Sequence, residues 1–74
     1  MKAIDMIATG NCIKLAIKKS SYNARTLSEA IGVSPLAIYK WTSGRNLPTL
    51  DNLVIMSDLL KMDLDSLIVT REVV

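Results

Sequence analysis

The chain has 74 residues, half of them hydrophobic, and a formal net charge of +2 at pH 7. This length and hydrophobicity predict one small folded domain over residues 1–74 and exclude an intrinsically disordered chain. Phe is absent and only Tyr22, Tyr39 and Trp41 are aromatic, so the core is expected to be aliphatic.

Several function classes lack the residues that they need. There is no histidine and only one cysteine, Cys12, which excludes an intramolecular disulfide and a Cys/His metal site. We therefore expect no enzyme activity, no cofactor and no bound metal. No apolar run approaches the roughly 20 residues of a membrane span, and the N-terminus does not have the pattern of a signal peptide. The sequence thus predicts a cytoplasmic protein.

Apolar residues at helical spacing predict a first helix over about residues 10–20. This stripe consists of Ile13, Ala16 and Ile17. Residues 1–8 are ambiguous, because they fit either a frayed end or an upstream extension of the helix. Thr9, Gly10 and Asn11 are predicted to interrupt such an extension, with Thr9 or Asn11 as the N-cap.

Two short helices are predicted next, over about residues 24–31 and 35–43. Asn23 and the pair Ser34-Pro35 are typical of helix starts. Gly32 between the helices can adopt a positive φ without steric cost, so it ends the first and turns the chain. The two helices share an apolar seam made of Leu27, Ile31, Val33, Ile38 and Trp41. Two helices, a glycine turn and this seam predict a helix-turn-helix.

The rest of the chain is predicted as a loop, two more helices and a tail. Gly44 ends the third helix, and Arg45–Pro48 forms an extended loop because the residue before proline avoids helix. Thr49 caps a wide apolar helix, and Asp63 caps a last short one. The tail, residues 69–74, has strand-type residues. Because a lone strand has no partner in an all-helical monomer, we expect the tail to fray or to pair with another chain.

Charge is distributed unevenly along the chain. Residues 1–45 contain seven lysines and arginines against two carboxylates, a balance of +5, whereas residues 46–74 contain two against five, a balance of −3. The basic half contains the helix-turn-helix. A polyanion such as DNA is expected to be attracted to this half, and the attraction weakens with added salt.

The order of these motifs resembles the Cro and repressor (XRE-like) family of phage and bacterial transcriptional regulators. The resemblance extends from about Ile13 to Ile68. Its most specific segments are Ala30–Ser34, Ile38 with Trp41, Ser43–Arg45 and Pro48–Leu50. It implies an all-α, compact five-helix bundle of the lambda-repressor type, with the helix at 35–43 in the DNA major groove. It also implies a dimer on a two-fold operator.

Carried over residue by residue, the resemblance gives ten DNA-binding candidates. The base-contacting positions are Pro35, Leu36, Ala37 and Lys40, with Tyr39 beside them. The phosphate-contacting positions are Asn23, Ser34, Arg45 and Asn46, with Arg25 as a further cation. Three features depart from the family. The first three base-contacting positions are apolar, Ala24 replaces a usual glutamine, and Lys61 stands where a helix-ending glycine is usual.

The function implied is a small sequence-specific repressor, Cro-like and of phage or prophage type, that acts by occupying an operator. The alternative is a modulator of a partner repressor in a genetic switch, an antirepressor or corepressor that works mainly through protein contact. The apolar surface at Pro35 and Leu36 fits that alternative. Candidate partners are therefore operator DNA, a second copy of the chain and a partner repressor. Salt sensitivity distinguishes the two functions.

Overall fold

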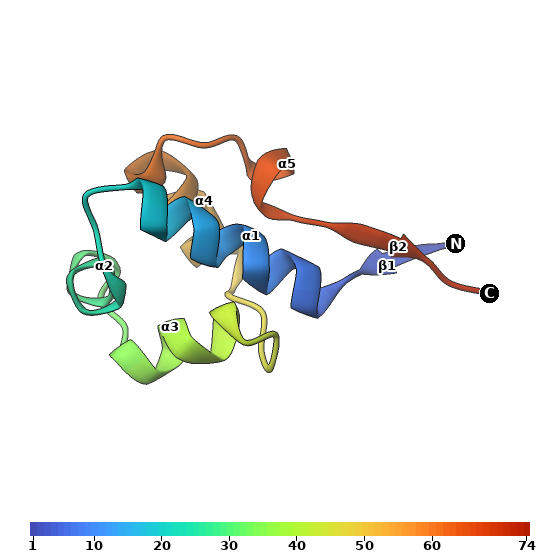
Figure 1. Cartoon of the computed structure of the whole chain (residues 1–74), viewed down its shortest axis with the longest axis horizontal. Helices are drawn as coiled ribbons and strands as arrows, with labels where there is room; N and C mark the ends of the chain where they lie inside the picture. Colours follow the sequence, from blue (N-terminus) through green and yellow to red (C-terminus); the bar gives the residue numbers. More distant parts are fainter.

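The computed structural model describes all 74 residues, as five helices and a two-stranded ribbon. In chain order the elements are β1 (Lys2–Ile4), α1 (Met6–Lys19), α2 (Ala24–Ile31), α3 (Pro35–Thr42), α4 (Leu50–Leu60), α5 (Leu64–Leu67) and β2 (Thr70–Glu72). The helices group together, and the ribbon projects from them with both termini at its far end (Figure 1). The predicted five-helix, all-α fold is confirmed, with the short ribbon as an addition to it.

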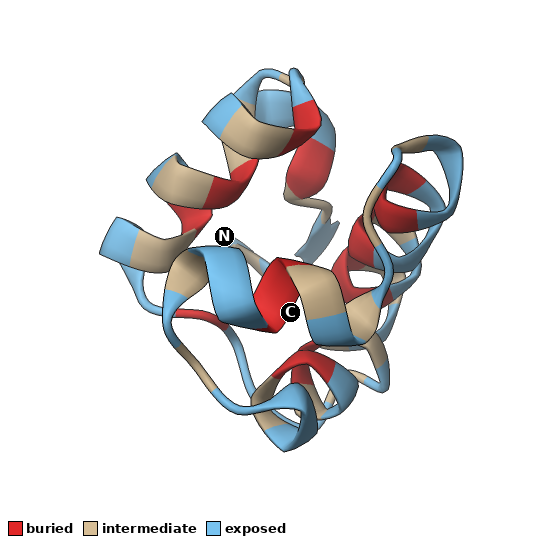
Figure 2. Cartoon of the chain, turned by 90° about the vertical axis from the view of Figure 1, so that its left-hand side faces the viewer, coloured by how far each residue is buried: buried red, intermediate tan, exposed pale blue.

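The core lies where the five helices meet. α1 packs against α3 and α5, while α2 packs against α3 and α4. Figure 2 shows the buried positions distributed over all five helices. The buried hydrophobic side chains are Ile13, Ala16, Ile17, Leu27, Ile38, Trp41, Leu53, Met56, Leu60 and Leu67. Trp41 is the only aromatic residue among them, so the prediction of an aliphatic core is confirmed.

The helix-turn-helix is built from the local signals that predicted it. Asn23 accepts a hydrogen bond from the Thr26 N–H at 2.9 Å, and the Thr26 hydroxyl accepts one from the Asn23 N–H at 2.9 Å. This capping box starts α2. Gly32 ends α2 at φ +91°, and Ser34 starts α3 by accepting from the Ala37 N–H at 3.2 Å. The predicted bounds of both helices hold to within one residue.

The predicted start of the first helix is wrong. α1 begins at Met6, and the Asp5 carboxylate is its N-cap, accepting from the Ala8 N–H at 3.0 Å. Gly10 is buried inside α1, where a Cβ would lie 2.6 Å from the carbonyl oxygen of Trp41. Because tertiary contacts override weak helix propensity, Gly10 is a packing position and does not break the helix.

Thr9 is also a packing residue, not an N-cap. Its side chain is buried, and its hydroxyl accepts from the Val69 N–H at 3.0 Å and donates to the Val69 carbonyl oxygen at 3.2 Å. The Val69 carbonyl also accepts from the Asp5 N–H at 2.8 Å. These bonds hold Val69, which lies between α5 and β2, to the start of α1. They thereby place the tail beside the N-terminus.

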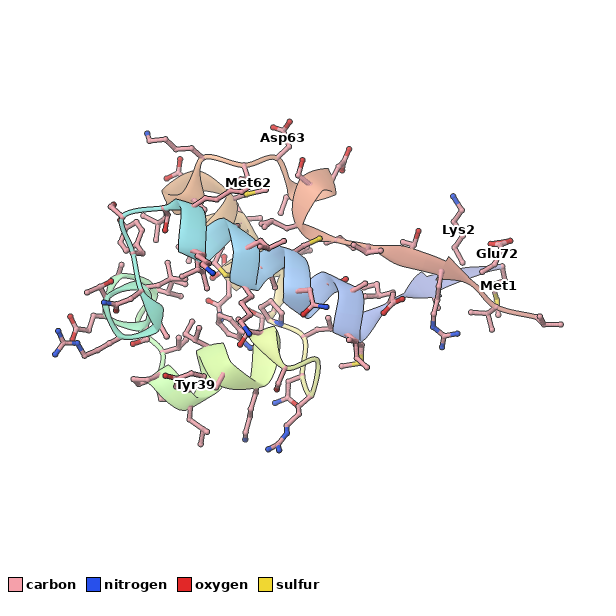
Figure 3. The ribbon with its side chains drawn as sticks, viewed as in Figure 1. Met1, Lys2, Tyr39, Met62, Asp63 and Glu72 are labelled. Atoms are coloured by element: carbon pink, nitrogen blue, oxygen red, sulfur yellow. The ribbon has the colours of Figure 1, made fainter.

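The tail does form a strand, but its partner lies in the same chain, contrary to expectation. β1 and β2 are antiparallel, with Lys2 opposite Glu72, Ala3 opposite Arg71 and Ile4 opposite Thr70. Figure 3 shows Met1, Lys2 and Glu72 together at the end of the ribbon. The terminal ammonium lies 3.6 Å from the Glu72 carboxylate, but both groups are exposed, so this pair adds little stability.

α4 and α5 follow the predicted order, but the predicted cap of α5 is not formed by the Asp63 side chain. Thr49 caps α4 by accepting from the Asn52 N–H at 3.2 Å. Lys61 ends α4 in the left-handed conformation, at φ +56°. Asp63 occupies the N-cap position of α5, on the turn shown in Figure 3, yet its side chain makes no capping hydrogen bond. The short α5 is therefore held by the burial of Leu67 in the core.

Candidate nucleic-acid interface

α3 presents an apolar outer face to solvent. Ile38 and Trp41 point into the core, whereas Leu36 and Tyr39 are 60% and 61% exposed. Pro35 is exposed as well, and Ala37 is half-buried. Lys40, also half-buried, is the only charged residue of the helix. The five predicted base-contacting residues thus lie on one short helix, with a single cation among them.

Two predicted phosphate-contacting residues, Asn23 and Ser34, are the exposed N-caps of α2 and α3. Their side-chain oxygens already accept from backbone N–H groups of their own helices. The Asn23 amide hydrogens and the Ser34 hydroxyl hydrogen make no hydrogen bond within the chain. These hydrogens are the groups that remain for an anionic ligand.

The loop after α3 positions Arg45 and Asn46. Their backbone N–H groups donate to the Lys40 carbonyl oxygen at 2.9 and 3.2 Å, which holds the loop against the end of α3. Gly44 precedes them at φ +77°, and a Cβ there would lie 2.9 Å from the Cα of Ile7. Both side chains are exposed, so the guanidinium and the amide are available to a ligand.

None of the cations around α3 is neutralised within the chain. The pair between the terminal ammonium and Glu72 is the sole ion pair within 4.0 Å. Arg25, Lys40 and Arg45 therefore have no carboxylate partner. An exposed surface with unpaired cations is suited to bind phosphate groups.

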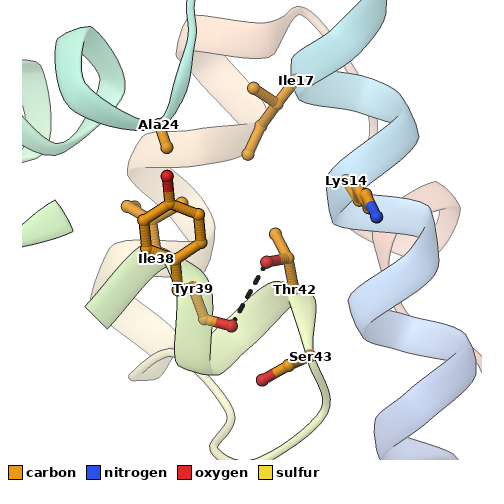
Figure 4. Close-up of a pocket in the computed structure, with 7 residues that line it drawn as sticks. All are labelled: Lys14, Ile17, Ala24, Ile38, Tyr39, Thr42 and Ser43. Atoms are coloured by element: carbon orange, nitrogen blue, oxygen red, sulfur yellow. Dashed lines mark hydrogen bonds between the residues drawn. The ribbon is translucent and has the colours of Figure 1, made fainter. Parts of the chain in front are cut away.

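A groove not anticipated from the sequence lies beside this surface, between α1, α2 and α3. Its volume is about 330 Å³ (Figure 4). Lys14 lies on one side of it and Ala24 on the other, and the Tyr39 hydroxyl points toward Ala24. The lining residues are Lys14, Ile17, Ala24, Ile38, Tyr39, Thr42 and Ser43. No spacing signal in the sequence links Lys14 to α3.

No group of three or more His, Cys, Asp or Glu side chains lies close enough together to hold a metal ion. None of the helices has both the length and the apolar character needed to cross a membrane.

A helix-turn-helix family model matches residues 13–67, which is most of the chain. The chain belongs to this family. Membership confirms the resemblance to Cro and repressor (XRE-like) proteins and identifies a DNA-binding transcription regulator of that type.

Among solved structures, the fold is similar to the restriction-modification controller protein C.AhdI from Aeromonas hydrophila, with a TM-score of 0.77. The two chains are 16% identical, and the match covers 85% of this chain and 96% of that one. At this identity the similarity shows the fold alone. The comparison with curated proteins gave no match.

Proposed function

We propose that this family member is a Cro-like repressor of phage or prophage type that occupies an operator with α3 in the major groove, in the bacterial cytoplasm or nucleoid. The observation that supports the proposal is the exposed outer face of α3, flanked by cations without carboxylate partners. A helix of this size fits the major groove, where base pairs present distinct hydrogen-bonding patterns.

The roles of the α3 residues follow from their chemistry. Lys40 donates to guanine O6 or N7, since it is the one cation on the helix. Leu36 and Ala37 contact thymine methyl groups, which is the contact that apolar side chains make with a base edge. Pro35 forms the exposed first turn of the helix, next to these contacts, and the Tyr39 hydroxyl hydrogen-bonds a phosphate or a base edge.

Phosphate contacts surround this small set of base contacts. Arg25, Arg45 and Asn46 offer exposed cationic or amide groups, and Asn23 and Ser34 offer the hydrogens left free by their capping bonds. The free N–H groups at the start of α2 add to them. With few base contacts, selectivity depends in part on DNA shape and deformability.

The proposal includes a homodimer, because a two-fold operator binds two copies. A second groove, of about 250 Å³, has a mostly apolar lining near the start of α4. Leu50, one of its lining residues, is 72% exposed, and Val54, one turn further along α4, is 49% exposed. These two side chains, with Leu47 of the preceding loop, are proposed as the surface that a second copy covers.

Contact with a partner repressor is the second candidate function. It is favoured by the exposure of Leu36 and Tyr39 on α3, because large exposed apolar and aromatic residues are typical anchors of protein interfaces. In that function the chain modulates a genetic switch as an antirepressor or corepressor, and DNA contact is secondary.

Fluorescence anisotropy with DNA duplexes at two salt concentrations tests the proposal. The duplexes include DNA from around the chain's own gene and a random sequence. If a complex contacts four phosphates, its affinity falls about 100-fold between 50 and 200 mM salt. A steep fall on one preferred duplex supports the repressor. Weak binding that is indifferent to both sequence and salt supports the partner-protein function.

A further inference from the structure

The groove between α1, α2 and α3 extends the nucleic-acid surface beyond the helix-turn-helix. We propose that it seats a stretch of the DNA sugar–phosphate backbone and that Lys14 of α1 binds a phosphate there. This inference rests on the proposed function, because it adds a contact to the same DNA complex. It assigns a binding role to α1, on which none of the ten candidate residues lies.

The chemistry of the lining fits a phosphodiester and its sugar. Ala24 and the exposed Tyr39 ring supply an apolar surface against which a deoxyribose can pack, and the buried Ile17 and Ile38 form the floor beneath it. Polar groups complete the lining, namely the Lys14 ammonium and the hydroxyls of Tyr39, Thr42 and Ser43. Protein–DNA complexes direct most of their hydrogen bonds to phosphate and sugar, and lysine and hydroxyl side chains supply many of them.

The hydroxyls in the groove are only loosely engaged. Thr42 donates to the Tyr39 carbonyl oxygen and Ser43 to the Lys40 carbonyl oxygen, each at 3.3 Å. These separations exceed the usual 2.5–3.0 Å range of O–H···O hydrogen bonds. Both hydroxyls can therefore turn to a phosphate oxygen at little cost.

The charge around the groove favours an anion. None of its seven lining residues is acidic, and Lys14 has no carboxylate within 4.0 Å. Only two carboxylates occur in residues 1–45, Asp5 and Glu29. Asp5 caps the opposite end of α1, and Glu29 lies near the end of α2, five residues beyond Ala24.

The groove is continuous with the proposed DNA surface. Tyr39 belongs both to the groove and to the outer face of α3. Ala24, which lines the opposite side, lies between the phosphate candidates Asn23 and Arg25 in the chain. A DNA sugar–phosphate backbone that contacts the start of α2 and the outer face of α3 thus passes along the groove and comes within reach of Lys14.

Salt-dependent anisotropy of the wild type and three variants tests this role. Phosphate contacts are independent of sequence, so a mixed-sequence duplex of about three helical turns serves as the probe. Lys14→Gln is expected to lower affinity about fivefold to tenfold near 0.1 M salt and to reduce the slope of log affinity against log salt by about one per bound copy. Lys14→Arg is expected to restore both.

Lys61→Gln is the matched control, since it removes one positive charge at the end of α4, outside the groove, and is expected to leave the slope unchanged. Circular dichroism of each variant confirms the fold. A Lys14→Gln slope equal to that of the wild type overturns the inference while leaving the proposed function intact. Absence of duplex binding by the wild type rejects the proposed function, and the inference with it.

Discussion

Gly10 lies against the backbone at the end of α3, next to Trp41. A Cβ on Gly10 would be 2.6 Å from the Trp41 carbonyl oxygen and 2.8 Å from that of Thr42. These neighbours are backbone atoms, so they cannot move aside as a flexible side chain does. The lack of a side chain at residue 10 therefore sets how closely α1 approaches α3, and with it the width of the groove beside α3.

Gly10→Ala is expected to lower the free energy of unfolding by about 2 kcal/mol, because overpacking outweighs the gain in helix propensity of about 1 kcal/mol. Urea denaturation followed by circular dichroism measures the change. Asn11→Ala is the control, since Asn11 is the next residue of α1 and is exposed. It is expected to leave stability unchanged or slightly higher. Equal stability of Gly10→Ala and the wild type would contradict the tight approach.

Lys61→Gly is expected to raise the free energy of unfolding by about 0.5–1 kcal/mol. Lys61 adopts the left-handed conformation at φ +56°, which glycine accepts without strain. The higher entropy of glycine in the unfolded chain offsets part of this gain. Lys61→Ala retains the strain, so it should show no such rise. If Lys61→Gly and Lys61→Ala have the same urea midpoint, relief of backbone strain at residue 61 does not raise the stability.

Leu50→Gln is expected to weaken self-association while helical content stays constant. Leu50 is 72% exposed, so the fold does not depend on it, and we propose that a second copy covers it. Sedimentation equilibrium of the free protein over a range of concentrations measures the effect. Leu15→Gln is the control, because Leu15 is 54% exposed on α1, outside the proposed surface. If Leu50→Gln and Leu15→Gln both self-associate as the wild type does, the proposed dimer surface at Leu50 is wrong.

The helix-turn-helix could be predicted because its signals are local. Asn23, Gly32 and Ser34 each determine the conformation of residues within four positions in the chain, and each acts in the structure as predicted. Leu27, Ile38 and Trp41 are buried as their spacing indicated. No contact between distant segments was needed to infer these elements.

The start of α1 and the ribbon could not be predicted because they depend on distant residues. Gly10 and Thr9 are poor helix formers by propensity, yet both lie inside α1, where Gly10 is close to the Trp41 backbone and Thr9 is hydrogen-bonded to Val69. The partner of β2 lies 68 residues away at Ala3, and a three-residue strand has too weak a pattern to indicate it. The proximity of Lys14 to Tyr39 likewise depends on how α1 packs against α3.

The central claim, that α3 contacts bases, is tested most directly by the selectivity of Lys40→Ala. Anisotropy gives the affinity for the preferred duplex and for a random duplex, and their ratio measures selectivity. Loss of one base contact is expected to reduce this ratio about tenfold, given roughly 1–3 kcal/mol for a good contact. Lys61→Ala, which removes a charge at the end of α4, is expected to leave the ratio unchanged. A Lys40→Ala variant that loses affinity equally for both duplexes, or for neither, would contradict base contact by α3.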